Sequence, residues 1–376
     1  LRPQSFRPGI WLGLGGALLV YGLGAGGLGA KPTAGSLPEA SSNAGRLVYV
    51  ATYDGVINPV AAEYLTGAIQ KAHEAHAQLL VVRLDTPGGL DTSMRTIIKE
   101  IIASDVPVAI YVSPSGARAA SAGVFITLAA HIAAMAPGTN IGAAHPVSMG
   151  GGPMDDVMKA KVENDAAAYI RSIAEKRGRN VQWAEDAVRK SLSITEKEAL
   201  KLNVIDLVPE NLDRLLETLH GREVATATGP KTLFTQSIEK KEIPMGTRLR
   251  ILNLLSDPNV AYVLMILGIY GLFFELASPG AILPGVVGAI FLILAFYAFQ
   301  TLPVNYAGIL LILLGGILFI AEIKITSYGL LTVAGIISMV LGSVMLMDTD
   351  VPFFKVSWSV ILPMVVMTAG FFLFAI

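Results

Sequence analysis

The amino-acid sequence predicts an α/β domain with parallel strands, followed by an all-α membrane domain with several spans. Strand and helix patterns alternate between residues 46 and 225, and the strand-like runs contain almost no polar residues. Residues 259–376 are mostly apolar. Over the whole chain, 53% of residues are hydrophobic and the mean hydropathy is +0.59, a value that soluble globular proteins rarely reach. Part of the chain is therefore expected to lie in a lipid bilayer.

The composition excludes several classes of function. The chain has no cysteine, which rules out disulfides, thiol catalysis and cysteine metal sites. The formal net charge is -1, so a nucleic-acid partner is not expected. The histidines are scattered, and no zincin pattern, P-loop or dinucleotide fingerprint occurs. A metal site is therefore not predicted.

Residues 1–30 have the pattern of an export signal. Arg2 and Arg7 precede an apolar run at 10–28, and small residues follow that run. The segment is either a signal peptide or an uncleaved N-terminal anchor. In both cases the following residues are sent across the membrane. Residues 31–45 are rich in Pro, Gly, Ser and Ala and are predicted to be a linker.

Residues 46–225 are predicted to form the α/β domain. Its strands are expected at 48–51, 79–84, 106–112, 131–136 and 204–208. Its helices are expected at 58–76, 92–103, 124–130, 155–177, 183–190 and 211–220. Thr195 and Glu198 have capping-box spacing and predict one more helix start. Residues 226–258 are polar and are predicted to be a connector.

Residues 259–376 are predicted to hold about five transmembrane helices. The apolar spans are at about 259–274, 281–299, 306–321, 328–346 and 356–376. Gly268, Glu275 and Gly288 recur 47 positions later as Gly315, Glu322 and Gly335. We infer a duplicated pair of spans joined by tight turns. A membrane carboxylate is a functional candidate, but Glu275 and Glu322 sit at span ends within reach of headgroups or water.

The chemistry is centred on Ser121. This serine stands between small residues, after a buried strand pattern and at the start of a helix pattern. Small neighbours leave the hydroxyl accessible, and a helix N-terminus places N–H groups beside it. Acyl transfer needs an exposed nucleophile with donors for a negative oxygen. The alternative is a serine in a small-residue helix contact.

Two glycines provide the predicted oxyanion hole. Gly88 and Gly89 follow the buried strand at 79–84, where the end of a parallel strand commonly forms a site. Glycines there let the backbone turn and leave N–H groups unpaired. The donors would be the N–H near Gly88 and the N–H of Ala122. An ordinary strand-to-helix turn is the other interpretation.

A serine nucleophile needs a base, and the sequence offers two candidates. His145 lies 24 residues after Ser121, and Lys161 lies 40 residues after it at the start of a long helix. A lysine can act as a base where an apolar pocket disfavours the ammonium. Lys159 is a control, two residues away and on a different face of the helix. A solvated surface charge remains the alternative for Lys161.

Three segments carry a family resemblance: 87–89 (PGG), 119–123 (AASAG) and 136–144 (APGTNIGAA). From about residue 46 to 376 the chain resembles the long form of the NfeD family, membrane-bound serine proteases of the ClpP/crotonase superfamily. The resemblance implies a ClpP/crotonase-like fold similar to signal peptide peptidase, with Ser121 as nucleophile. It implies that the base is Lys161, while His145 lies near the position of the catalytic histidine in soluble Clp proteases. His145 is therefore kept as an alternative base or a substrate-binding residue.

The resemblance also implies a substrate and a setting. By this resemblance, the expected substrates are membrane-associated partners of the stomatin type, cut in a hydrophobic segment near the partner's C-terminus. It implies a homo-oligomer and a reaction that needs no metal or organic cofactor. The export signal and the apolar spans predict a multi-pass protein in the cell membrane whose protease domain is extracytoplasmic. Long members usually carry a small C-terminal β-barrel of the OB type, and no such pattern occurs up to Ile376. A non-catalytic membrane scaffold that binds a stomatin-like partner is the competing hypothesis, because fold alone does not fix function.

Overall fold

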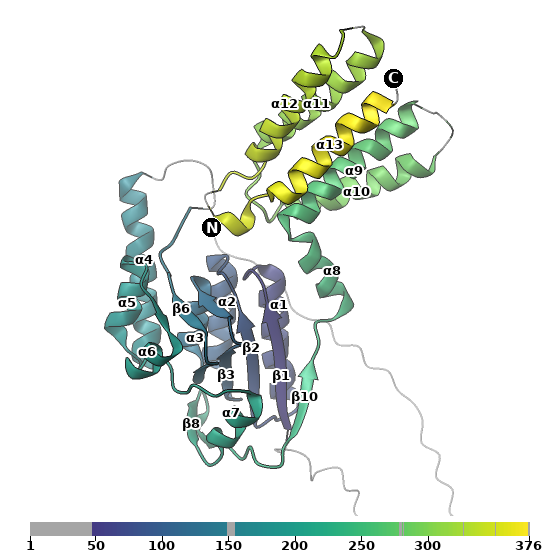
Figure 1. Ribbon diagram of the computed structural model, residues 1–376. Coiled ribbons are helices and arrows are strands. Elements are labelled where there is room, and N and C mark those ends of the chain that lie inside the picture. Colours follow the sequence, from purple (N-terminus) through teal and green to yellow (C-terminus); the bar gives the residue numbers. More distant parts are fainter. Residues whose placement is uncertain are drawn as a thin grey trace, which may run out of the picture. The chain divides into compact units, whose positions relative to one another are not determined.

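The computed structural model describes residues 47–148, 155–277, 280, 282–325, 327–349 and 351–374 (Figure 1). Residues 43–376 form one compact unit. The predicted signal peptide or anchor and the predicted linker lie outside the described residues. Within the described residues, an α/β domain comes first and a helical region follows it in the chain.

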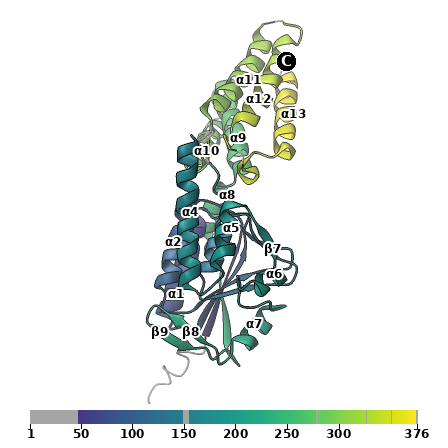
Figure 2. The same ribbon diagram turned by 90° about the vertical axis from the view of Figure 1, so that its left-hand side faces the viewer.

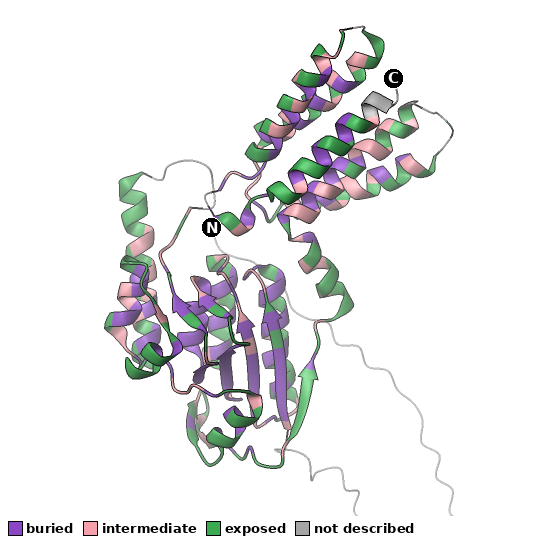
Figure 3. Cartoon of the chain, viewed as in Figure 1, coloured by how far each residue is buried: buried purple, intermediate pink, exposed green. Residues whose placement is uncertain are grey.

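The centre of the α/β domain is a five-stranded sheet in which all pairings are parallel. The strand order is β10-β1-β2-β3-β5. The strands are β1 (Leu47–Asp54), β2 (Leu79–Asp85), β3 (Val108–Val112), β5 (Ile132–Met135) and β10 (Glu239–Ile243). The central strands are buried over nearly their whole length, which Figure 3 shows as a purple centre. A sheet covered on both faces explains the nearly continuous apolar runs in the sequence.

Alternate side chains of these strands enter two separate cores. One core contains Ala51, Leu80 and Ile110 with helices α1 (Pro59–Glu74) and α2 (Asp91–Ala103). It also receives the following helices: α3 (Ala122–Ala129), α4 (Asp156–Lys176), α5 (Val181–Arg189) and α6 (Glu196–Lys201). The other core contains the intervening strand residues with α7 (Leu212–Leu219). The period-two alternation therefore builds the layers, because successive strand residues point to opposite faces.

A second, smaller sheet positions the Ser121 turn. It has the order β4-β6-β7, with β4 (Arg118–Ala120), β6 (Asn140–Gly142) and β7 (Ser193–Thr195). The predicted capping box at the start of α6 is present: the Thr195 hydroxyl accepts from the Glu198 N–H, and the Glu198 carboxylate accepts from the Thr195 N–H. Because β4 ends at Ala120 and α3 begins at Ala122, Ser121 is the single residue between them.

Two parts of the α/β domain differ from the sequence prediction. The strand expected at 204–208 is wrong, since only Leu207 forms an isolated bridge, to Ala134. The connector expected at 226–258 is largely structured: it includes β10, which adds an edge strand beside β1, and α8 (Thr247–Leu255). A hairpin of β8 (Glu223–Thr226) and β9 (Gly229–Thr232) precedes β10. The charged sequence of β10 concealed this strand, because an edge strand needs little apolar surface.

The helical region contains a helix at each of the five predicted spans. They are α9 (Pro258–Ala277), α10 (Leu283–Phe299), α11 (Tyr306–Lys324), α12 (Leu330–Met345) and α13 (Trp358–Phe374). Within the part of the chain that the structure describes, three segments are long and apolar enough to cross a membrane: Pro258–Leu276, Tyr306–Lys324 and Pro352–Phe371. The helices α10 and α12 are shorter, with 17 and 16 residues. That all five cross the bilayer stays a prediction.

Glycines let the helices of each predicted repeat approach closely. A Cβ on Gly268 would lie 2.9 Å from the carbonyl oxygen of Gly288. The equivalent Cβ on Gly315 would lie 2.9 Å from the carbonyl oxygen of Gly335. Close backbone contact of this kind is typical of membrane helix pairs. The matching contacts, 47 residues apart in sequence, support the inferred duplication.

Candidate active site

Ser121 occupies a strained turn between β4 and α3. Its φ is 51° and its ψ is -113°, a conformation that residues with a Cβ rarely adopt. The Ser121 N–H donates to the Gly142 carbonyl oxygen at 3.1 Å, which fixes the turn against β6. The strand before it and the helix after it are both packed into the core. Such a turn presents a side chain outward from a rigid base, as a nucleophile requires.

Glycine is needed at two places around this turn. Gly88 has φ 121°, and a Cβ there would lie 2.6 Å from the Ser121 Cβ. At Gly123, a Cβ would lie 2.6 Å from the Thr86 methyl carbon. The loop after β2 therefore packs directly against the Ser121 turn. This brings together the two segments that the sequence predicted to meet.

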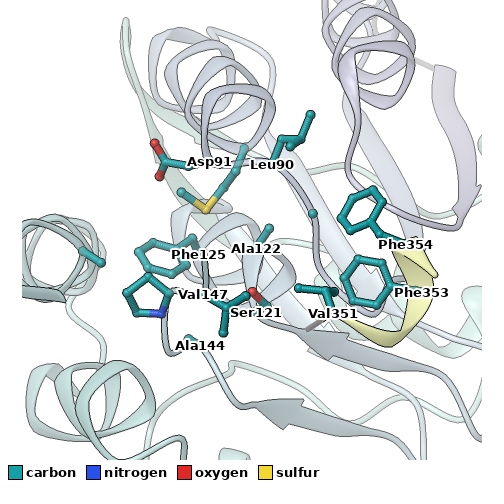
Figure 4. A pocket seen from close by; sticks show the side chains of 14 residues that line it. Leu90, Asp91, Ser121, Ala122, Phe125, Ala144, Val147, Val351, Phe353 and Phe354 are labelled. Atoms are coloured by element: carbon teal, nitrogen blue, oxygen red, sulfur yellow. The ribbon is translucent and has the colours of Figure 1, made fainter. Parts of the chain in front are cut away.

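The Ser121 side chain lines a pocket of about 160 Å³ (Figure 4). Most of the lining is apolar and comes from the α/β domain: Leu90, Met94, Ala122, Phe125, Ala144, Pro146, Val147 and Ala166. Gly89 and Asp91 also contribute. The remaining lining residues are Val351, Phe353 and Phe354, from the segment before α13. The sequence prediction missed these three, because no local pattern connects them to a serine 230 positions earlier (351 minus 121).

The described backbone offers two amide donors beside Ser121. The amides of Gly89 and Ala122 donate to no acceptor within the described residues, and both residues line the pocket. The Ala122 N–H is free because it is the first in α3. The Gly88 N–H instead donates to the Thr86 hydroxyl at 3.1 Å. Of the three predicted oxyanion residues, Gly89 and Ala122 thus have available donors, whereas Gly88 supplies the space for Ser121.

Lys161 lies in the exposed first part of α4, and it is not among the residues lining the pocket. Within the described residues its amine forms no hydrogen bond or ion pair. The pocket contact of α4 is Ala166. On a regular helix, Lys159 points within about 20° of Ala166, whereas Lys161 points about 140° away from it. The structure therefore does not bring Lys161 to Ser121 in this conformation.

His145 is held away from the pocket by its own hydrogen bond. Its Nδ1 lies 2.9 Å from the Val188 carbonyl oxygen in α5. Its chain neighbours Ala144 and Pro146 line the pocket, but His145 does not. The bond assigns the proton to Nδ1 in the neutral ring, because a carbonyl can only accept. The structure thus gives His145 an anchoring contact on α5.

The middle of α4 is fixed beside the pocket by one cluster. Arg95 on α2 pairs with Asp91 at 2.8 Å and with Asp165 on α4 at 2.5 Å. Its guanidinium also lies 4.2 Å from the ring centroid of Tyr169, which stacks on Phe125 of the pocket. Burial raises the pKa of the Tyr169 phenol, so the ring stays neutral. This cluster connects α2, α3 and α4 around the site.

The two membrane carboxylates hold turns between helices. Glu322 accepts from the Ser327 hydroxyl at 2.6 Å and from the N–H groups of Gly329 and Thr332 at 3.0 Å. It therefore caps the start of α12. A Cβ on Gly285 would lie 2.8–2.9 Å from two side-chain carbons of Glu275, so the glycine leaves the space that this side chain occupies. These contacts support a structural function for both carboxylates.

The fold and this site define a membrane-bound serine peptidase with a parallel-stranded α/β domain. The chain belongs to the NfeD family. Residues 259–376 match the NfeD integral membrane domain, and residues 47–216 match the N-terminal domain of NfeD1b.

The relatives agree with this assignment. The membrane-bound protease PH1510 of Pyrococcus horikoshii is 39% identical over 304 residues, which are 80% of this chain and 69% of that protein. A solved structure of the 1510-N membrane-bound stomatin-specific protease, a lysine-to-alanine mutant in complex with a substrate peptide, is 34% identical with a TM-score of 0.52. It covers 56% of this chain and 98% of its own. A serine-to-alanine mutant of the same protease is 37% identical with a TM-score of 0.50, covering 54% of this chain and 99% of its own.

Proposed function

We propose that this chain is a serine endopeptidase that uses Ser121 and Lys161 to cleave hydrophobic segments of membrane-associated proteins. The observation that carries the proposal is the Ser121 turn: a strained serine lines an apolar pocket together with two residues whose amides have no acceptor among the described residues. The mutants named in the related structures change one serine and one lysine, which supports a Ser–Lys pair in the family. A Ser–Lys pair needs no acidic third member.

In the proposed reaction, the Ser121 hydroxyl attacks the peptide carbonyl and its proton passes to the Lys161 amine. The negative oxygen of the tetrahedral intermediate accepts from the Gly89 and Ala122 N–H groups. Lys161 then gives the proton to the leaving amine, which departs and leaves an acyl group on Ser121. A water molecule releases this acyl group, with Lys161 again accepting and returning a proton. Neither step requires a metal or an organic cofactor.

The proposal requires movement of the first turns of α4. Residues 155–161 are all exposed, so few contacts oppose a rotation or a bend that brings Lys161 toward Ser121. Lys159 is the competing amine, because it points toward the side of Ala166 on a regular helix. The experiment must therefore separate these two lysines.

The test measures cleavage of an apolar peptide by the full chain in lipid vesicles. Ser121→Ala should reduce turnover by at least about 10³-fold, and Lys161→Ala by about 10²–10⁴-fold. Lys159→Ala and His145→Ala should stay within about twofold of the unchanged chain. A fluorophosphonate probe should label Ser121. If Lys161→Ala remains active while Lys159→Ala or His145→Ala does not, the assignment of the base is wrong.

The substrate is proposed to be a stomatin-like partner in the same membrane. PH1510-N is described as stomatin-specific, which supports this choice. We place the protease domain on the extracytoplasmic side and expect a homo-oligomer. In a pull-down from vesicles, a stomatin-type protein should be cleaved by the unchanged chain and retained intact by Ser121→Ala. Retention without cleavage by the unchanged chain would instead support the non-catalytic scaffold.

A further inference from the structure

Three apolar residues from the helical region form part of the Ser121 pocket. They are Val351, Phe353 and Phe354, in the segment between α12 and α13. Figure 4 shows Phe125 on one side of Ser121 and these three residues on the other. The pocket is therefore completed by a segment more than 100 residues after the end of the α/β domain at Ile243.

Internal contacts hold this segment in place. Residues Pro352–Phe354 form a single 3-10 turn, with the Phe354 N–H donating to the Val351 carbonyl oxygen at 3.1 Å. The Val351 N–H donates to the Thr349 hydroxyl, also at 3.1 Å. Phe354 is 5% exposed and packs in the core of the helical region. Phe353 is less buried and has its ring centroid 4.9 Å from that of Phe354. The turn thus presents Phe353 to the pocket from a fixed base.

The same segment begins a candidate membrane span, which runs from Pro352 to Phe371. Chain continuity therefore places this wall of the pocket at the boundary of the bilayer. A peptide entering the pocket from a membrane-anchored protein would meet Phe353 close to the point where it leaves the lipid. Aromatic side chains suit such a boundary.

The pocket has little means of recognising a polar side chain. Among the described residues that line it, Asp91 is the polar side chain besides Ser121, and its carboxylate is already paired with Arg95 at 2.8 Å. An apolar side chain loses nothing by entering such a pocket, whereas a polar one loses its hydrogen bonds to water.

We infer that the turn at 351–354 determines specificity: Phe353, with Val351 and Phe354, receives an apolar side chain next to the scissile bond of a segment held at the membrane surface. The inference rests on the proposed peptidase function. It assigns part of the substrate selectivity to the membrane region rather than to the α/β domain.

The test uses the full chain in lipid vesicles and two peptides that differ only in Leu or Ser beside the scissile bond. Phe353→Ala should lower the Leu-to-Ser ratio of kcat/KM about tenfold, because one apolar contact discriminates by this order. Phe353→Leu should restore most of the ratio. Phe296→Ala, which removes an exposed ring of α10 outside the pocket, should leave the ratio unchanged.

Labelling of Ser121 by a fluorophosphonate separates selectivity from folding. Phe353→Ala should be labelled within twofold of the unchanged rate, since the probe is small and reacts through the nucleophile, the base and the amides, none of which this substitution changes. An unchanged peptide ratio, equal losses on both peptides, or faster turnover of both would each overturn the inference. The last result would identify the turn as a lid.

The same experiment distinguishes a failure of the proposed peptidase function from a failure of the inference about the turn at 351–354. If the unchanged chain neither labels at Ser121 nor cleaves the Leu peptide, the peptidase proposal fails. If it does both, and Phe353→Ala has the same peptide ratio, only the assignment of the wall residues fails.

Discussion

The Ser121 turn and the first part of α4 are built in opposite ways, although the proposed reaction needs both. The turn is enclosed by backbone: Gly88 and Gly123 leave room for it, and Gly142 accepts its N–H. Residues 155–161 of α4 are exposed throughout. Further along, α4 is fixed again at Asp165 and Tyr169 by Arg95. Only the end of α4 that bears Lys161 is free of such contacts within the described residues.

This difference shows how one site can combine precision with movement. An oxyanion hole must be in place before the reaction, since its benefit depends on donors that need no reorganisation. A proton acceptor can arrive with the substrate, because its hydrogen bond tightens when the complex forms. We therefore expect substitutions at the turn to damage reactivity strongly, and substitutions around α4 to act more weakly.

The largest effect is expected from Gly88→Ala. The new Cβ would collide with Ser121 and would force a residue with a side chain to φ 121°. We expect a loss of about 2–4 kcal/mol in stability and at least a 100-fold drop in Ser121 labelling. Thermal unfolding and fluorophosphonate labelling of the full chain measure these two quantities.

Gly116→Ala is the matched control for this substitution. Gly116 also has a positive φ, 90°, but a Cβ there meets no atom within 4 Å. The Gly116→Ala variant should lose only about 1 kcal/mol of stability, and its Ser121 should be labelled at the unchanged rate. Equal labelling losses in the two variants would show that backbone strain, not the approach of Gly88 to Ser121, controls the site.

An intermediate effect is expected from a substitution of His131. This residue lies where hydrogen bonds hold the C-terminal ends of α3 and α4 together. Its Nδ1 accepts from the Val108 N–H, and the Arg179 guanidinium donates to the Leu128 and Ala130 carbonyl oxygens. Burial, reinforced by the nearby arginines and lysine, lowers the pKa of His131 to about 3.

This lowered pKa makes the folded chain less stable at acidic pH. Below its ordinary pKa of 6.5, His131 takes up a proton more readily in the unfolded chain. Its contribution to stability is therefore complete above pH 6.5 and declines as the pH falls toward 3. Between pH 7 and pH 5, the unchanged chain should lose about 1–2 kcal/mol more than His131→Asn. Melting temperatures at both pH values test this, with the exposed His76→Asn as control; parallel losses in all three proteins would contradict the assignment.

The smallest effect is expected from Arg95→Met. This change removes the pairs with Asp91 and Asp165 and the contact with Tyr169. Partly exposed ion pairs and cation–π contacts contribute little, so stability should fall by only about 1 kcal/mol. Peptide turnover and Ser121 labelling should both fall about threefold to tenfold, because both use Lys161 as the base and α4 is held less firmly.

Arg214→Met is a suitable control, since Arg214 pairs with Glu217 on an exposed surface of α7. Its turnover should equal that of the unchanged chain. A 100-fold loss of Ser121 labelling for Arg95→Met, as large as that expected for Gly88→Ala, would mean that the turn and α4 are not independent, which would remove the distinction between the two regions.

Local patterns in the sequence predicted most of the fold. The runs at 79–84 and 106–112 have few polar residues because both faces of their strands are covered, and the structure confirms β2 and β3 there. The helix expected at 155–177 is α4. The strand β10 was missed because it pairs with β1, about 190 residues earlier in sequence, and carries charges on its exposed side. Pairing over that distance leaves no periodic signal.

The candidate site was predicted unevenly. Ser121, Gly89 and Ala122 were predicted from small residues at strand-to-helix turns, and the structure places all three in the lining of the pocket. The hydrogen bond from the Gly88 N–H to the Thr86 hydroxyl was not predicted, because it depends on a side-chain orientation that residue spacing does not specify. The spacing of residues also did not predict that Lys161 is exposed. The rotation of a helix about its axis decides which of Lys159 and Lys161 faces the pocket.

Local sequence patterns were enough to predict most of the helices, the central strands and the apolar spans, and to identify the serine at a sharp turn. These properties follow from hydrophobic period, glycine and helix-end preferences, which act over a few residues. Long-range packing, in contrast, places Phe353 in the same pocket as Ser121 and leaves the Lys161 end of α4 exposed. Both depend on packing between segments far apart in the chain, where the geometry is set by mutual contact rather than by local preference.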